Sequence, residues 1–262
     1  MYNGIALYGT ESISSSLALE IGISFFNSMN IKVSSAGYTK YLKKGDHKGD
    51  HKTIDISLST LKSKINSGEK MSFRIYNEDK NQLPWLASFA YSTNEFGNFY
   101  HIDMQCPLQD KERILDFIRN FLSKITFSYG IVYSYDKTTS AYFYSFGGNL
   151  LTKYTNENPS AFQEETPGEL PGSERYKDSM LRMIYPINII NEDHLQIDVK
   201  GKTLNEWILS NECHGKLERL NEKLWLWIVD ENILDDLNNY CGEAGILIAW
   251  ELKAKKRKPK LP

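Results

Sequence analysis

The spacing of apolar residues predicts three helices in the first half of the chain. Across residues 12–29 apolar side chains recur every four positions, which is typical of an amphipathic helix, although Gly22 lowers the helical propensity. Across 110–125 they form a broader apolar stripe, and Asp110 is suited to capping the first turn. A shorter helix is expected over 58–66.

Three strand-like runs lie between the second and third of these helices. Residues 71–77, 85–92 and 99–105 are rich in aromatic and β-branched side chains, and turn-forming residues separate them. The polar stretch 43–53 contains a tandem Gly-Asp-His-Lys repeat, and such a duplication is tolerated best in an exposed loop. This order predicts an α+β fold in which helices pack on one face of an antiparallel or mixed sheet.

The second half of the chain mixes strands and helices again. Residues 156–174 hold three prolines and two glycines but no lysine or arginine, which predicts a long loop. The elements expected around it are strands over 129–135 and 141–146, an edge strand or bend over 181–190, a helix over 203–209 capped by Thr203, a strand over 223–229, an acidic helix over 231–240 and a strand over 245–252.

These elements favour a single α+β domain over residues 1–252. The order of elements allows a division into two related lobes, 1–126 and 127–252, joined by the long acidic loop 156–174. The basic tail 253–262 contains two prolines and is expected to be frayed.

Composition and charge narrow the class of protein. The 262 residues are 41% hydrophobic and 24% charged, as in ordinary globular proteins, and a formal net charge of −2 provides no general attraction to nucleic acid or anionic membranes. Three widely spaced cysteines without a CxxC pair predict reduced, buried thiols. Because the first cation is Lys32 and no apolar run approaches the length of a membrane span, we expect a cytoplasmic protein without a signal peptide.

No residue pattern points to catalysis or to a bound metal or cofactor. His47 and His51 are four residues apart and each follows an aspartate, but Gly45 and Gly49 disfavour the helix that would bring them onto one metal. The Gly147-Gly148 pair lacks the further glycines and the basic residue of a phosphate-binding loop, and favours a turn. We therefore expect no catalytic, cofactor-binding or metal-binding residue and no enzymatic activity.

Two acidic segments predict a surface for a basic partner. The loop 156–174 carries five carboxylates, and the stretch 224–252 carries six carboxylates and no lysine or arginine. Complementary charge of this kind speeds encounter and sharpens specificity. The residues predicted to contact the partner are Glu157, Glu164, Glu165, Glu169, Glu174, Asp230, Glu231, Asp235 and Asp236.

The C-terminal third resembles a known family over about residues 180–250. The resemblance is carried by the run Arg-Met-Ile-Tyr-Pro-Ile-Asn at 182–188, His194-Leu195, Gly-Lys-Thr-Leu at 201–204 leading into Trp207, Gly-Lys-Leu at 215–217 and Leu226-Trp227. With the Tyr-rich N-terminal half and its Phe-Gly-Gly-Asn-Leu segment at 146–150, this order is similar to that of the immunity protein 52 family of bacterial polymorphic toxin and type VI secretion loci.

The resemblance implies a cytoplasmic inhibitor that binds a cognate toxin, often a nuclease of restriction-endonuclease type. An acidic surface would suit the basic DNA groove of such a nuclease. We therefore predict a protein that neutralises a toxin domain encoded beside it and binds neither membrane nor nucleic acid directly. Three alternatives stay open: a chaperone or adaptor that loads a secreted effector without inhibiting it, an enzyme that uses His101, Asp103 and His194, and a nucleic-acid-binding module that works through the basic residues 253–260.

Overall fold

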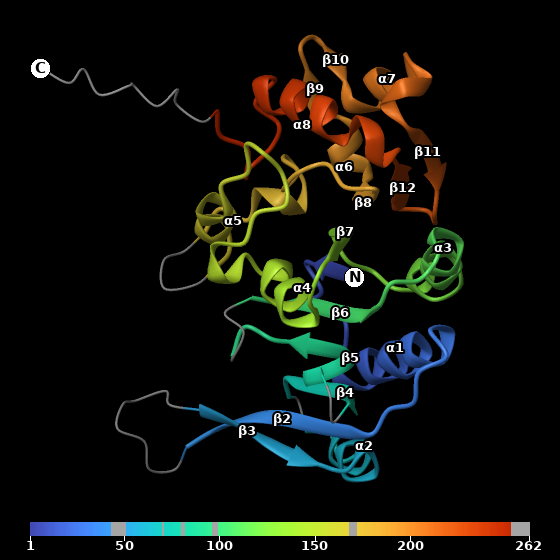
Figure 1. Ribbon diagram of the computed structural model, residues 1–262, viewed down its shortest axis with the longest axis vertical. Helices are drawn as coiled ribbons and strands as arrows, with labels where there is room; N and C mark the ends of the chain where they lie inside the picture. Colours follow the sequence, from blue (N-terminus) through green and yellow to red (C-terminus); the bar gives the residue numbers. More distant parts are fainter. Residues whose placement is uncertain (43–50, 70, 80–81, 96–98, 168–171, 253–262) are drawn as a thin grey trace, which may run out of the picture.

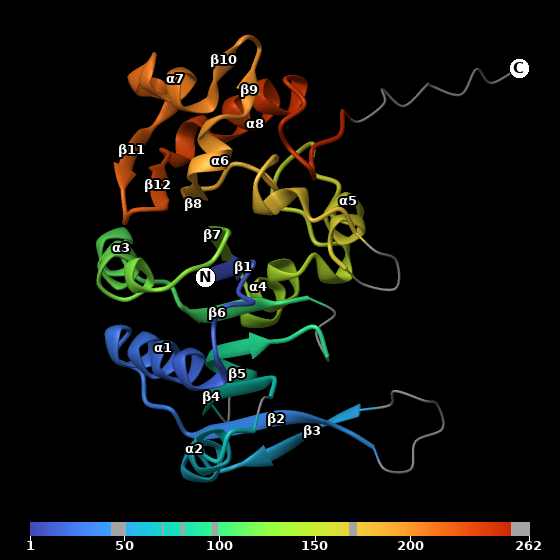
Figure 2. The same ribbon diagram turned by 180° about the vertical axis from the view of Figure 1, so that it is seen from behind.

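One continuous antiparallel sheet runs through both halves of the chain in the computed structural model (Figures 1 and 2). The structure describes residues 1–262 except 43–50, 70, 80–81, 96–98, 168–171 and 253–262. The ten strands of this sheet follow the order β11-β12-β8-β7-β1-β6-β5-β4-β2-β3, and β9 and β10 form a separate two-stranded sheet. The strands are β1 (Tyr2–Tyr8), β2 (Ser35–Tyr41), β3 (His51–Ile56), β4 (Phe73–Asp79), β5 (Gln82–Ser92), β6 (His101–Pro107), β7 (Tyr129–Tyr135), β8 (Ile187–Asn191), β9 (Asp198–Val199), β10 (Lys202–Thr203), β11 (Lys216–Arg219) and β12 (Leu224–Ile228).

The helices pack on both faces of this sheet. In Figure 1, α1, α2 and α3 lie on one side of the strands and α4 and α5 on the other. The α-helices are α1 (Ser15–Ser28), α2 (Leu58–Asn66), α3 (Lys111–Asn120), α4 (Thr138–Ser145), α5 (Pro159–Glu165), α6 (Glu192–Leu195), α7 (Leu204–Leu209) and α8 (Leu234–Glu243). Short 3₁₀ turns occur at Leu122–Lys124, Gly148–Leu150, Arg175–Lys177, Glu212–His214 and Glu231–Ile233.

The first face of the sheet, covered by α1, α2 and α3, holds one of two apolar cores. Ile75 of β4 and Phe89 of β5 are fully buried beneath α1. A Cβ atom on Gly22 would lie 2.7 Å from Phe89 Cδ1, so the glycine that costs helical propensity lets α1 approach the sheet closely. The helices therefore take the positions that their apolar stripes require.

The second face holds the other core, which is rich in tyrosine and tryptophan. Ala141 and Tyr144 of α4 are fully buried against β1 and β7. Farther along the same core, Trp207 of α7 meets Trp227 of β12 edge to face, with ring centroids 6.2 Å apart. Successive residues of one strand point into opposite cores: Ile5 of β1 lies in the first core and Ala6 in the second.

Several sequence-based expectations are confirmed. The fold is α+β with an antiparallel sheet, and α2 and β7 have the predicted bounds. Asp110 caps α3 by accepting a hydrogen bond from the Arg113 amide at 2.9 Å. Thr203 and Glu206 form the capping box expected at α7.

Other expectations were wrong. Helices lie on both faces of the sheet rather than one. The predicted strand 141–146 is instead the second half of the helix α4 and its C-cap Phe146, because helical spacing places Ala141, Tyr144 and Ser145 together on the sheet. The span 245–252 forms only isolated bridges.

Two predicted loops also contain regular structure. The segment 156–174 includes α5, which Asn158 caps. The expected loop 43–53 ends in β3, while its residues 43–50 and the basic tail 253–262 lie outside the described part of the chain.

The strand β1 was not predicted, although it is central to the fold. All seven of its residues pair with β6 on one side and with β7 on the other. The two lobes expected from the sequence therefore share one sheet, and β1 is the strand at which they meet.

Candidate functional site

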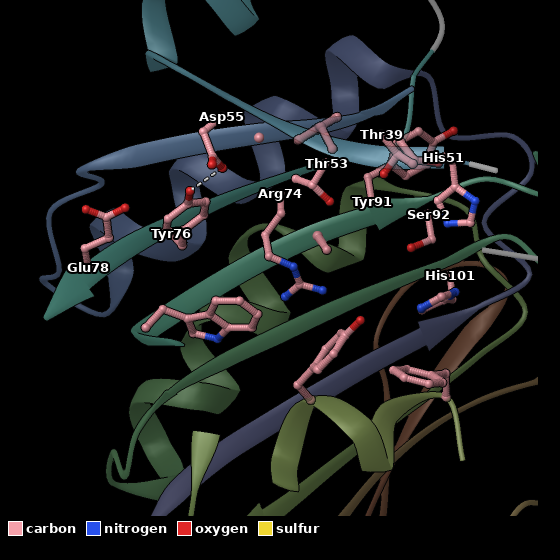
Figure 3. A pocket seen from close by; sticks show the side chains of 17 residues that line it. Thr39, His51, Thr53, Asp55, Arg74, Tyr76, Glu78, Tyr91, Ser92 and His101 are labelled. Atoms are coloured by element: carbon pink, nitrogen blue, oxygen red, sulfur yellow. Dashed lines mark hydrogen bonds between the residues drawn. The ribbon is translucent and has the colours of Figure 1, made fainter. Parts of the chain in front are cut away.

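The second face of the sheet is hollowed over β2, β3, β4 and β5. The helix α4 packs against β1, β6 and β5, and beyond it the side chains of this face line a hollow of about 680 Å³. Figure 3 shows Arg74, Asp55 and His101 standing on the strands that form its floor. Gly37 and Ala90 oppose Arg74 on the two neighbouring strands, and their small size gives the floor its depth.

Arg74 of β4 crosses the floor and contacts the adjacent strand β5 and, beyond it, β6. Its two terminal nitrogens each lie 3.1 Å from one carboxylate oxygen of Asp103 on β6, in the fork geometry of a bidentate pair. Nη1 also donates to Ser88 Oγ at 2.8 Å, and Gln105 Nε2 donates to Asp103 Oδ1 at 2.8 Å. The Asp103 side chain is fully buried and the Arg74 side chain is 16% exposed, so their charges largely cancel. The centre of the hollow is therefore close to neutral.

Two aromatic rings enclose the Arg74 guanidinium. Its Cζ lies 4.8 Å from the ring centroid of Trp85 on β5 and 4.4 Å from that of Tyr142 on α4. The two rings meet edge to face at 5.8 Å. These cation–π contacts join α4 to the sheet and fix one wall of the hollow.

One end of the hollow is acidic. Asp55 of β3 and Glu78 of β4 are exposed, and Tyr76 donates a hydrogen bond to Asp55 Oδ1 at 3.0 Å. Partial burial, the bond to Asp55 and the charges of both carboxylates raise the pKa of Tyr76 to about 12. Within the described residues neither carboxylate forms an ion pair with a cation, so this end carries two uncompensated negative charges beside an aromatic ring.

The opposite end of the hollow carries hydroxyl and imidazole groups. Thr39, Ser92, His51 and His101 line it. The His101 ring stacks on Phe99 with centroids 4.4 Å apart, and burial lowers the pKa of His101, which keeps its imidazole neutral near pH 7. The second histidine of the sequence pair, His47, lies outside the described residues.

The three residues of the enzyme alternative do not converge. His101 Nε2 lies 3.8 Å from Asp103 Oδ2. His194 instead belongs to α6, where Nε2 is 3.0 Å from the carbonyl oxygen of Tyr176 and the ring packs on Tyr129. Of these residues His101 lines the hollow, Asp103 is buried beneath it, and His194 is buried elsewhere.

The acidic residues predicted for partner contact divide into buried and exposed groups. Glu157 and Glu165 are 3% and 5% exposed, so these two do not contribute to an acidic surface, contrary to the prediction. Glu165 pairs with Arg175, and Glu174 accepts from Tyr176 and forms an ion pair with Lys177. The exposed members are Glu164, Asp230, Glu231, Asp235 and Asp236, while Glu169 lies outside the described residues.

Four of the five exposed carboxylates gather at the start of α8, and the fifth, Glu164, lies on α5. Asp230 caps the 3₁₀ turn that precedes this helix by accepting from the Asn232 amide at 2.9 Å. Asp235 and Asp236 lie in the first helical turn, where negative charge also stabilises the helix dipole. The segment 156–174 contacts α8, because the Asn156 side-chain amide donates a hydrogen bond to Asn239 Oδ1 at 2.8 Å.

Glu157 belongs to a buried polar cluster around Arg182. The guanidinium of Arg182 is fully buried, and its Nη1 donates to Tyr8 Oη at 3.2 Å and to the carbonyl oxygens of Tyr144 and Ser145. Glu157 lies 3.9 Å from Nη2 and accepts from Tyr144 Oη at 2.6 Å. This cluster ties the C-terminal segment to the sheet.

The residues of the hollow were not identified from the sequence as a site. The sequence pattern that could have revealed them is the alternation of apolar and polar residues in β4. Phe73 and Ile75 face the first core, whereas Arg74, Tyr76 and Glu78 face the hollow on the other side. Alternation places these residues on one face, but the partners on other strands depend on sheet order and register.

Within the described residues, no group of three histidine, cysteine, aspartate or glutamate side chains is placed to hold a metal ion. No helix in the described ranges is long and apolar enough to cross a membrane. Cys106 and Cys241 are buried as expected, but Cys213 is exposed.

Comparisons with known proteins identify the fold. No family model and no curated protein matches the sequence. A solved structure described as Pseudomonas aeruginosa T6SS protein PA0821 shares the fold with a TM-score of 0.54 and 10% sequence identity. The match covers 94% of this chain and 76% of that one, so the similarity of fold extends over nearly the whole chain.

Proposed function

We propose that this chain is an immunity protein that binds a cognate bacterial toxin in the cytoplasm and blocks its active site. The observation that carries the proposal is the fold, which extends over 94% of the chain and is shared with a protein of a type VI secretion system. The resemblance of residues 180–250 to the immunity protein 52 family supports the same assignment. Three of the motif residues, Tyr185, Trp207 and Trp227, lie in the core, as their apolar character requires.

Binding rather than catalysis accounts best for the polar groups of the hollow. Arg74 and Asp103 satisfy each other, and Ser88 and Gln105 complete their hydrogen-bond network. His194 is engaged in the capping of α6. Because these groups are mostly buried and satisfy one another, they hold the surrounding surface in place, which suits a protein that recognises a partner by shape and charge.

The exposed carboxylates near α8 are proposed to contact the toxin. A nuclease toxin has a basic groove for DNA, and a carboxylate-rich surface can occupy that groove in place of phosphates. We propose Asp230, Glu231, Asp235 and Asp236 for this role because all four are exposed.

Co-expression with the product of the neighbouring gene tests the function. Cells that express this neighbour alone should lose viability, and co-expression of the wild-type chain should restore their viability. The purified chain should bind the purified neighbour with a Kd near 1 nM, which corresponds to a binding free energy of about −12 kcal/mol. Asp230→Lys combined with Asp235→Lys should weaken that binding. The proposal fails if the neighbour is harmless, or if cells still die while soluble chain is present.

The same experiment separates an inhibitor from a chaperone or adaptor. A chaperone would raise the solubility or secretion of the neighbour and leave its toxicity intact. Restored viability together with a stable complex supports inhibition, whereas improved delivery without rescue supports the chaperone.

A further inference from the structure

We infer that the hollow over β2–β5 is a docking site for a positively charged segment of a partner protein, which places an arginine or lysine side chain at the acidic end between Asp55 and Glu78. The inference rests on the proposed function for the identity of the partner, the toxin. The positive charge of the bound segment is inferred from the residues of the hollow alone.

The position and size of the hollow suit a protein segment. The helix α4 covers the second face over β1, β6 and β5, and beyond β5 its Tyr142 ring reaches Arg74 of β4. The uncovered part of this face, over β4, β2 and the edge strand β3, forms the floor of the hollow of about 680 Å³. Binding sites of about 300–1,000 Å³ accommodate several side chains, so a loop or extended segment of a partner can lie on this floor.

The charge balance of the hollow selects a cation. Arg74 is the central cation, but Asp103 pairs with it through two bonds of 3.1 Å. Asp55 and Glu78 remain without an ion pair among the described residues. Because the buried Asp103 cancels the charge of Arg74, the hollow keeps a net excess of two negative charges. Burial, the hydrogen bond to Asp55 and the charges of Asp55 and Glu78 together raise the pKa of Tyr76, so part of this rise comes from the local negative field. A phosphate backbone would be repelled by the same charges, which argues against a nucleic acid as the occupant.

The acidic end also has the aromatic surface that guanidinium and ammonium groups prefer. Tyr76 and Trp85 lie with ring centroids 6.0 Å apart, next to the two carboxylates. A guanidinium donates in a fork to carboxylate oxygens and stacks on aromatic rings. The contact between Arg74 and Trp85 is an internal example of that chemistry in the same hollow.

A short basic peptide tests the site on the protein alone. The probe is a fluorescently labelled six-residue peptide of alternating glycine and arginine, with glutamate in place of arginine as the reference, followed by fluorescence anisotropy at low salt. The double variant Asp55→Asn with Glu78→Gln should weaken binding of the arginine peptide by roughly fivefold or more. The amide introduced by Asp55→Asn keeps an oxygen that can accept the Tyr76 hydrogen bond, so the fold of this end is preserved.

Matched controls separate the hollow from general electrostatic attraction. The double variant Asp235→Asn with Asp236→Asn removes the same charge from α8 and should change peptide affinity less than about twofold. In addition, Thr53→Arg places a cation on the exposed edge strand that lines the hollow, and should weaken peptide binding as an internal competitor. Equal losses in both double variants, or equal binding of the glutamate peptide, would overturn the inference.

The partner protein provides a separate arm of the test. If the neighbouring gene product binds wild-type chain and the hollow variants with the same affinity, the inference fails while the proposed function stands. If the neighbour does not bind at all, the proposed function fails, and the peptide titration alone decides whether the hollow accepts a basic segment.

Discussion

Replacement of Arg182 by methionine should destabilise the protein strongly, because its guanidinium has no access to water. The change removes hydrogen bonds to Tyr8 Oη and to the carbonyl oxygens of Tyr144 and Ser145, at 3.2, 2.7 and 3.2 Å. It also removes the cation 3.9 Å from Glu157, a carboxylate that is itself buried. Methionine has a similar length and is apolar, so the loss is mainly one of polar partners rather than of volume.

The size of the effect follows from the groups left behind. Breaking a buried ion pair by removing one partner costs about 3–5 kcal/mol, since the other charge remains buried. Glu157 keeps the hydroxyl of Tyr144 at 2.6 Å and the amides of Lys153 and Tyr154 at 2.6 and 3.2 Å, which reduces that cost. In the other direction, Nε and Nη2 of Arg182 have no hydrogen-bond partner among the described residues, so the native guanidinium is itself only partly compensated. We expect a loss of about 3 kcal/mol in the free energy of unfolding.

Urea denaturation of single and double variants measures this loss. Arg182→Met and Glu157→Gln should each be destabilised, and the double variant should lose at least about 1 kcal/mol less than the sum of the two single changes. Arg182→Lys, which keeps a charge but not the planar donor group, should lie between wild type and Arg182→Met. A loss below about 1 kcal/mol in Arg182→Met, or strict additivity in the double variant, would refute the reasoning.

Further predictions concern pH, a helix cap and the thiols. Burial lowers the pKa of His194 to about 4, so below about 6.5 the unfolded chain takes up a proton that the folded chain does not. The free energy of unfolding should therefore fall as pH drops from about 6.5 to about 4, and His194→Gln should flatten this part of a pH series of urea melts. Thr203→Ala should cost about 1 kcal/mol by removing the cap of α7, whereas Thr203→Ser should retain most of it; equal melting temperatures would contradict this. A thiol reagent should modify exposed Cys213 quickly, while Cys106 and Cys241, whose pKa values burial raises to about 12, should react only after unfolding.

The local sequence predicted those helices and strands that begin with a clear capping residue or have a clear spacing of apolar residues. Asp110 and Thr203 identified the starts of α3 and α7, because a side-chain cap acts over three residues and needs no tertiary context. The run 141–146 was assigned to the wrong class of element, because an aromatic segment of six residues fits either period. Packing decides there: the helix buries Tyr144 against the sheet and leaves Tyr142 to close the hollow.

The candidate site was harder to predict than the elements. Charge alone grouped Glu157 with Asp235, although one is buried beside Arg182 and the other is exposed on α8. The hollow depends on Asp55 and Arg74 lying on either side of Gly37 of β2, and that relation comes from strand order and register, which are long-range properties of the sheet.

The central place of β1 has a consequence for biosynthesis. This strand precedes β6 by more than ninety residues and β7 by more than one hundred and twenty, so it leaves the ribosome long before either neighbour exists. Its apolar segment Ile5–Leu7 must stay unpaired until β6, its first partner in the sheet, has been synthesised. Insertion of β1 between β6 and β7 is then the step that joins the two halves of the sheet. A chain that lacks β1 should therefore complete its sheet when a synthetic peptide with the sequence of β1 is added, so that the peptide switches folding on.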